Sequence, residues 1–176
     1  EYLPQIAKAE IGFAIGYTEP QAGSDLAALQ LKAVKDGDDF VLNGQKVFSS
    51  NAHVVDYHWL MARTDPAAVK HRGLSLFIVD LKSPGITIHP IWHLWGSRTN
   101  EVFYDNVRVS KKNLVGEKNR GFYQMVAALE MERISTVGDI QRNLEDMIDY
   151  VRDSRSRAID PAKSQGVRQK LTTMAV

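Results

Sequence analysis

The sequence predicts an α+β protein in two parts, an antiparallel β-barrel or sandwich domain at residues 1–117 and the start of an α-helical bundle at residues 118–176. Between Ile11 and Val109, short apolar segments alternate with turn signals and no helix-length pattern intervenes. This arrangement disfavours a parallel α/β sheet. After Gly116, apolar residues recur at spacings of three and four, which is typical of an amphipathic helix.

The β part is punctuated by residues that favour turns. Leu29, Leu31 and Ala33 alternate with other residues before a turn at Asp36–Asp39, and Phe40–Leu42 resumes the strand pattern. Asn43-Gly44 is a strong hairpin signal, because both residue types tolerate positive φ. Further strands are expected at Tyr57–Arg63, Leu74–Leu81, Ile86–Ile91 and Val102–Val109.

Two helices are expected in the second part. The first begins near Arg120, and a second helix runs from Asp160-Pro161 to Met174. Two helices cannot bury an apolar seam by themselves, so further helices are expected in a longer parent chain. The residues of the first seam are Phe122, Met125, Val126, Leu129, Arg133, Val137, Ile140, Leu144, Met147 and Val151.

The composition excludes several classes of function. The chain has 176 residues with 22 Lys and Arg against 21 Asp and Glu, a net charge of +1, so no basic field indicates a nucleic-acid partner. The absence of cysteine excludes disulfides and thiolate metal sites, and the five histidines show no metal-ligand spacing. We therefore expect no metal site. No apolar run approaches the ~20 residues that span a bilayer, so no membrane span is expected.

Two polar segments are candidates for binding. The Tyr17–Asp25 segment combines Thr18 and Ser24 hydroxyls with turn residues, although alone it could be an ordinary strand-to-loop corner. The second segment, Phe48–Ser50, pairs an aromatic ring with two hydroxyls at a strand end, where a planar ligand could stack. An ordinary buried Phe followed by surface serines is the alternative.

A charged pair accompanies the helical seam. Glu132 lies at the edge of the seam and Arg133 lies within it. Charges in an apolar seam are costly unless they are paired or used, so the pair either fixes helix register or performs chemistry. The chain has no Gly-x-Gly-x-x-Gly or Walker loop, so a bound nucleotide would not bind in the Rossmann manner.

Taken together, the motifs resemble those of the acyl-CoA dehydrogenase family over nearly the whole chain. The family's Thr-Glu-Pro-x-Ala-Gly-Ser-Asp flavin loop is matched by Thr18–Asp25, with Gln21 at the variable position. Its Asn-Gly-x-Lys is matched by Asn43–Lys46, and Phe48–Ser50 replaces its Trp-Ile-Thr. Its later strand motif resembles Ser97, Thr99, Val102 and Val107–Val109, and Asn113–Gly116 continue it.

The resemblance implies that FAD is the cofactor. Backbone at Tyr17 and Thr18 and the Thr18 hydroxyl would meet the pyrimidine edge of the flavin, and Ser24 would reach the pyrophosphate and lie near the acyl-CoA. Phe48 would cover the ring, and Ser50 would hydrogen-bond N5. Gly23 and Ser49 belong to the same two cofactor-binding segments.

The implied reaction is α,β-desaturation of an acyl-CoA thioester, with an electron-transfer flavoprotein as acceptor. Some family members carry the catalytic base on the first bundle helix within Leu-Glu-Arg, and Met131-Glu132-Arg133 resembles that pattern. Glu132 is then the expected base, with Arg133 near the substrate. The family also implies a dimer or tetramer, located in the bacterial cytoplasm or, in a eukaryote, the mitochondrial matrix.

One segment departs from the family pattern. Where the family has Arg-x-Gln-Phe-Gly, this chain has Arg155–Asp160 without Gln-Phe-Gly. In this it resembles members that form heterotetramers with half the flavin sites, including enzymes that act on steroid side-chain CoA thioesters. A non-catalytic partner subunit, a flavin monooxygenase and an acyl-CoA oxidase are the alternative functions.

Overall fold

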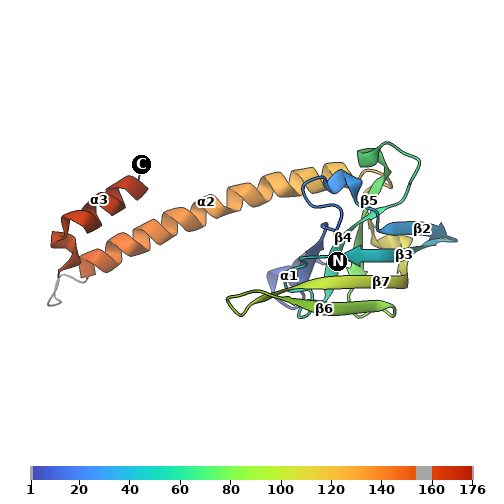
Figure 1. Cartoon of the computed structure of the whole chain (residues 1–176), viewed down its shortest axis with the longest axis horizontal. Helices are drawn as coiled ribbons and strands as arrows, with labels where there is room; N and C mark the ends of the chain where they lie inside the picture. The colour runs from blue at the N-terminus through green and yellow to red at the C-terminus, as the bar shows by residue number, and fades with distance from the viewer. Residues whose placement is uncertain (1, 154–159, 176) are drawn as a thin grey trace. The chain divides into compact units, whose positions relative to one another are not determined.

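The computed structural model describes residues 2–153 and 160–175, except for the side chains of residues 133–136. The chain divides into two compact units, Glu1–Met125 and Val126–Val176. The first is a β-domain and the second is helical, so the predicted α+β class is confirmed (Figure 1). The predicted domain boundary between residues 117 and 118 stays a prediction.

The β-domain is built on one mixed sheet. Its strands follow the order β6-β7-β3-β2-β4-β5-β8, and β1 pairs with β4 beside this path. Figure 1 shows β2, β3, β7 and β6 side by side. Two pairings in the described residues, β1 with β4 and β2 with β4, are parallel, and the strand path does not close. The sheet is therefore neither purely antiparallel nor a closed barrel. The strands are β1 (Phe13–Gly16), β2 (Lys32–Asp36), β3 (Asp39–Lys46), β4 (Tyr57–Arg63), β5 (Leu74–Asp80), β6 (Ile86–Trp92), β7 (Arg98–Ser110) and β8 (Leu114–Val115).

The helices lie mainly at the two ends of the chain. The predicted long helix begins at Gly121, one residue beyond the expected start. The predicted second helix is present, and a short 3₁₀ turn precedes it. The α-helices are α1 (Leu3–Ala7), α2 (Gly121–Asp153) and α3 (Gln165–Met174), and the 3₁₀ helices are η1 (Leu26–Ala28), η2 (Lys70–Gly73), η3 (Lys111–Asn113) and η5 (Pro161–Lys163).

Strand alternation determines which side chains enter the core. In β3, Phe40 and Leu42 point inward, and in β4 Leu60 and Ala62 do so. Side chains on one face of a strand recur every second residue. The same phase places two polar side chains inside the β-domain, Lys46 on β3 and His58 on β4, and both are fully buried.

The prediction of a hairpin turn at Asn43-Gly44 is wrong. These residues lie within β3, where the register against β7 shifts between Leu42 and Gly44, and the hairpin joining β2 to β3 turns at Asp36–Asp39, where a turn is expected. Gly44 has a φ of 141°, and a Cβ there would lie 3.0 Å from Cα of Leu31. The extra residue of this β-bulge lies on β7, where two residues oppose Asn43, and the glycine itself permits the close approach of two backbones.

The start of α2 is anchored on the β-domain. A Cβ on Gly121 would lie 2.7 Å from the carbonyl carbon of Ser75, and Met125 is buried. Beyond Met125 the apolar seam is largely uncovered, with Val137 and Ile140 more than 60% exposed. This is expected of helices taken from a larger bundle.

Candidate cofactor site

The Tyr17–Asp25 segment begins directly after β1 and folds into a tight turn. The backbone N–H groups of Glu19 and Ala22 each donate to the carbonyl of the other residue, both at 3.0 Å. Pro20 occupies the first central position, where its fixed φ favours the turn. Ala22 is buried beneath the turn, so the segment is anchored to the domain.

A buried ion pair anchors this loop from below. Lys46 Nζ donates to Glu19 Oε1 at 2.8 Å and to the carbonyl of Tyr17 at 3.0 Å. The Glu19 carboxylate also accepts from the backbone N–H groups of Gln30 (2.6 Å) and Leu31 (2.9 Å). Every charged group here has several partners, as a buried ion pair requires.

Burial lowers the pKa of Lys46 to about 8, and the attraction of the Glu19 carboxylate partly offsets this effect. The ammonium therefore still carries its charge at neutral pH, although the margin is small. The geometry of the Tyr17–Asp25 loop therefore depends on the Lys46 ammonium, although burial disfavours its charged form.

The second predicted segment lies beside this loop. The N–H of Val47 donates to the carbonyl of Thr18 at 2.9 Å, which joins the two segments through their backbones. Phe48 follows with a φ of 58°, in the left-handed region that bulky residues avoid, and its side chain is 59% exposed. An exposed ring on a strained backbone indicates a functional position.

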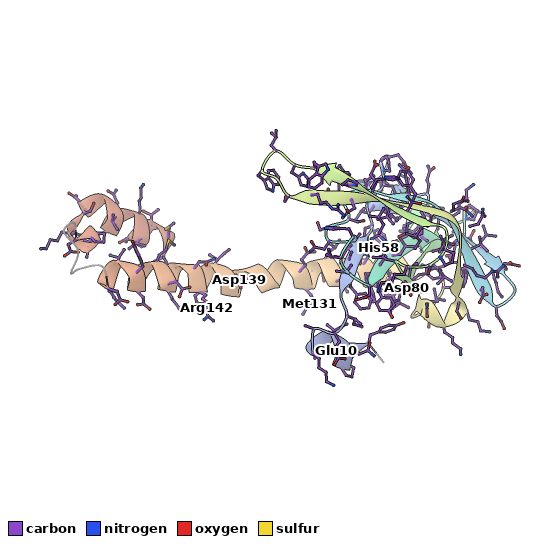
Figure 2. All side chains as sticks on the ribbon, turned by 90° about the horizontal axis from the view of Figure 1, so that it is seen from below. Glu10, His58, Asp80, Met131, Asp139 and Arg142 are labelled. Carbon is purple, nitrogen blue, oxygen red and sulfur yellow. The ribbon has the colours of Figure 1, made fainter. Side chains whose placement is uncertain are left out.

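Ser49 forms contacts through its N–H, its carbonyl and its hydroxyl. Its N–H donates to the carbonyl of Asn100 at 3.0 Å, its carbonyl accepts from Asn100 Nδ2 at 2.8 Å, and its Oγ lies 3.1 Å from His58 Nε2. The other ring nitrogen, His58 Nδ1, contacts the hydroxyl of Tyr104. We call Ser49, His58, Asn100 and Tyr104 the Ser49 clamp; all four residues are buried, and Figure 2 shows His58 among the strands of the β-domain.

Burial lowers the pKa of His58 to about 3, reinforced by the positive charge of Lys46 and opposed by a backbone hydrogen bond at Ile15. Burial also raises the pKa of Tyr104 well above its ordinary value. Both groups are therefore neutral at physiological pH.

This predicts a pH effect on stability. Between pH 6.5 and about 3 the unfolded chain binds a proton at His58 and the folded chain does not, so folding stability falls as the pH falls. The slope from this group approaches about 1.4 kcal/mol per pH unit. In unfolding measurements over this range, His58→Phe should show a correspondingly shallower loss of stability than wild type. Parallel pH profiles for the two proteins would contradict the prediction.

The structure brings the two predicted cofactor segments together, with different exposures. The exposed residues are Gly23, Ser24, Phe48 and Ser50, and Thr18 is half-buried. Tyr17 and Ser49 are buried. The side-chain hydroxyl of Ser49 points toward His58, so its expected part in cofactor binding is indirect.

Of the two site residues predicted on the long helix, the structure describes the side chain of Glu132 but not that of Arg133. Glu132 lies on α2 in the second compact unit, and its side chain is exposed there; Figure 2 labels its neighbour Met131. The side chain of Arg133 lies outside the described residues, as does the 155–159 part of the segment that departs from the family. Within the described ranges, no three His, Cys, Asp or Glu side chains gather into a possible metal site.

Three residues of the site were not predicted to have a role: Glu19, Lys46 and His58. The strand pattern contained the signal for two of them. Lys46 has the inward phase of Phe40 and Leu42, and His58 precedes the inward pair Leu60 and Ala62. A polar residue on the inward phase of an apolar strand needs a buried partner.

The exposed groups fit one face of a planar, hydrogen-bonding cofactor. Phe48 supplies a flat apolar surface, and the hydroxyls of Thr18, Ser24 and Ser50 lie on the same two segments. A ring with polar edges needs this combination of stacking surface and donors. The fold is that of a mixed-sheet β-domain on which these two polar segments lie side by side.

Comparison with known proteins identifies the family. Residues 14–107 match the family profile "Acyl-CoA dehydrogenase, middle domain" and residues 119–176 match "Acyl-CoA dehydrogenase, C-terminal domain". The chain belongs to the acyl-CoA dehydrogenase family.

Several relatives support this assignment. The acyl-CoA dehydrogenase FadE29 of Mycobacterium tuberculosis is 50% identical over 135 residues, which cover 76% of this chain and 35% of the relative. The solved Tcur3481-Tcur3483 steroid ACAD is 41% identical with a TM-score of 0.80, covering 98% of this chain and 44% of that chain. The ChsE4-ChsE5 complex from Mycobacterium tuberculosis is 36% identical with a TM-score of 0.78, covering 99% and 46%. The chain thus spans between about a third and a half of these relatives.

Helix α2 lies wholly within the second matched profile, and the boundary between the two compact units falls inside it, after Met125. None of the helices in the described residues is long and apolar enough to cross a membrane.

Replacing Phe48 by glycine tests both the backbone strain at this residue and the contact of its ring with FAD. Phe48→Gly should raise stability by roughly 1 kcal/mol or less, because glycine adopts positive φ without the steric cost, while its flexibility offsets part of the gain. The same change should weaken FAD binding roughly fivefold, since the stacking surface is lost. Thermal unfolding and flavin titration of the full-length protein measure both effects.

Asn51→Gly is the matched control, because Asn51 also has a positive φ (61°) but has no ring. Asparagine tolerates this conformation, so neither the stability of the protein nor its affinity for FAD should change much. If Phe48→Gly lowers stability and leaves FAD affinity unchanged, the ring has a packing role instead.

Proposed function

We propose that the protein containing this chain is an FAD-dependent acyl-CoA dehydrogenase that catalyses α,β-desaturation of an acyl-CoA thioester. Membership of the family supports the reaction class. The observation that carries the proposal is the pairing of the Thr18 loop with the exposed, strained Phe48. This pairing gives a flavin a stacking surface and adjacent hydroxyls.

The residues of the two segments would hold and orient the flavin, which supplies the redox chemistry when bound. Thr18 would contact the pyrimidine edge, Phe48 would cover one face of the ring and Ser50 would hydrogen-bond N5. Ser24 would contact the pyrophosphate and lie near the substrate. Tyr17, Gly23 and Ser49 would fix the backbone conformation of the two segments that make these contacts.

Glu132 would remove the α-proton of the substrate as general base, and Arg133 would lie near the acyl-CoA. The resemblance of Met131–Arg133 to the Leu-Glu-Arg pattern supports this assignment. A base that works on a weakly acidic C–H needs a position from which water is excluded. Glu132 is exposed on the isolated helix, so the proposal requires the rest of the protein to cover it.

The same relatives suggest a substrate class and an assembly. One solved neighbour is named a steroid ACAD and another is the ChsE4-ChsE5 complex. The missing Gln-Phe-Gly in Arg155–Asp160 also favours a heteromeric enzyme. We propose a steroid side-chain CoA thioester as substrate, an electron-transfer flavoprotein as acceptor and, because the named relatives are bacterial, a cytoplasmic location.

Anaerobic mixing of the purified full-length protein with FAD and a steroid side-chain acyl-CoA tests the proposal. Loss of the visible absorbance of the oxidised flavin, followed by slow reoxidation in air, is the expected result. Rapid reoxidation by oxygen would indicate an oxidase or monooxygenase. A protein that bleaches flavin only when a second subunit is added, and keeps this behaviour when Glu132 is changed, would be a non-catalytic partner subunit.

A further inference from the structure

We propose that His58 is a positioning residue that joins the two cofactor segments and fixes the conformation of Phe48–Ser50 through Ser49. The part of this inference that concerns flavin rests on the proposed function, but the conformational part does not. His58 is fully buried, so it acts on the segments through its neighbours and not by direct contact with a ligand.

His58 contacts one segment and the residue that leads into the other. Its Nε2 lies 3.1 Å from Ser49 Oγ, in the middle of the Phe48–Ser50 segment. Its ring also packs closely against Gly16, the residue before Tyr17, where an added Cβ would be 2.6 Å from Cε1 of His58. One side chain therefore lies between the centre of one segment and the residue that precedes the other.

The protonation states limit how these groups can donate. Tyr104 keeps its proton and is buried, and its hydroxyl forms a hydrogen bond with Nδ1 of His58. A neutral imidazole carries one N–H, so one ring nitrogen donates and the other accepts. Since Nε2 lies 3.1 Å from Ser49 Oγ, the clamp is a continuous chain of contacts from Tyr104 through His58 to Ser49.

The clamp explains how a strained residue can persist beside it. A bulky residue with positive φ persists only where its surroundings over-determine the backbone. The residue after Phe48 has its N–H and carbonyl held by Asn100 and its hydroxyl held by His58. With Val47 bound to Thr18 on the other side, the backbone is held by hydrogen bonds both before and after Phe48.

Packing alone does not account for the histidine. A buried polar ring costs free energy unless it is hydrogen-bonded, and phenylalanine would fill the same volume without that cost. His58 instead makes a hydrogen bond on each ring nitrogen. The polar contacts, not the volume, distinguish it from its core neighbours Leu60 and Ala62.

Hydrogen exchange on the full-length protein without added flavin tests the inference directly. In His58→Phe, peptides that contain residues 47–51 should exchange on the order of tenfold faster than in wild type, because a buried hydrogen bond that holds this segment is lost. Ser49→Ala should act in the same direction with less risk to folding, since it removes only one hydroxyl. Unchanged exchange at residues 47–51 in Ser49→Ala overturns the inference even where His58→Phe fails to fold.

Phe77→Leu is the matched control, because Phe77 is buried in the core of the β-domain and lies on β5, which carries neither segment. This variant should lower overall stability without a selective increase in the hydrogen-exchange rate at residues 47–51. An equal local increase in this control would show that the effect is general loosening, and would overturn a positioning role.

A flavin measurement separates this inference from the proposed function. If wild type binds FAD, both clamp variants should bind it roughly tenfold more weakly, as a mispositioned contact surface predicts. If wild type binds no FAD, the proposed function fails while the exchange result still decides the role of His58. If the variants bind FAD as wild type does and exchange normally, the function stands and the positioning role is wrong.

Discussion

Lys46→Met is expected to destabilise the β-domain by about 3–5 kcal/mol, because it leaves the buried Glu19 carboxylate without its cation. Methionine fills most of the space of the lysine stem, so the loss measures the charge and the hydrogen bonds more than a cavity. The carbonyl of Tyr17 loses its donor at the same time. We therefore expect the Tyr17–Asp25 loop to lose its fixed geometry and the full-length protein to retain little FAD.

Lys32→Met is the matched control for this prediction, since Lys32 is an exposed lysine on the neighbouring strand β2. It should change stability by no more than about 0.5 kcal/mol. Denaturant unfolding and the flavin content of purified protein provide the two measurements. Similar losses in both variants would mean that Lys46 has no special role.

Adding Glu19→Gln to Lys46→Met should recover part of the lost stability. The second change removes the uncompensated charge, although the amide cannot accept from Leu31 and Gln30 as well as the carboxylate does. In a double-mutant cycle, the two changes should therefore be strongly non-additive. Additive losses would show that Lys46 and Glu19 stabilise the domain independently.

Much of the β-domain could be predicted because its strands carry a regular apolar alternation. The expected strand at Tyr57–Arg63 coincides with β4, and the turn at Asp36–Asp39 joins β2 to β3. What local pattern could not provide was long-range pairing. The parallel contact of β1 with β4, and the bulge of β7 opposite Asn43, depend on strands far apart in the sequence.

The candidate site was predictable to a similar extent. The motif residues Thr18, Ser24 and Phe48 could be found by resemblance, and the structure brings their two segments together. Of the buried residues beneath them, Lys46 belongs to the matched Asn-Gly-x-Lys motif but was assigned no role, and His58 belongs to no motif. The strand pattern indicates that Lys46 and His58 point inward. It does not indicate which buried groups they contact, and their role depends on those contacts.

Glu132→Gln should nearly abolish flavin reduction by acyl-CoA in the full-length protein, with a loss of about 10²-fold or more, the contribution of a positioned acid–base group. Glutamine keeps the size of the side chain and cannot accept the α-proton as a base. FAD and acyl-CoA should still bind, because neither the Thr18 loop nor Phe48–Ser50 is changed. Rapid-mixing absorbance measurements under anaerobic conditions give the reduction rate, and ligand titration gives the affinities.

Glu130→Gln is the matched control, because Glu130 is also exposed on α2 and lies two residues away, on another side of the helix. Its reduction rate should remain within a few-fold of wild type. The competing account, a structural ion pair made by Glu132, predicts a different pattern: modestly reduced rates with altered thermal stability. A Glu132→Gln protein that reduces flavin near the wild-type rate would place the base on a part of the protein outside this chain or on a partner subunit, while leaving the cofactor role of the β-domain intact.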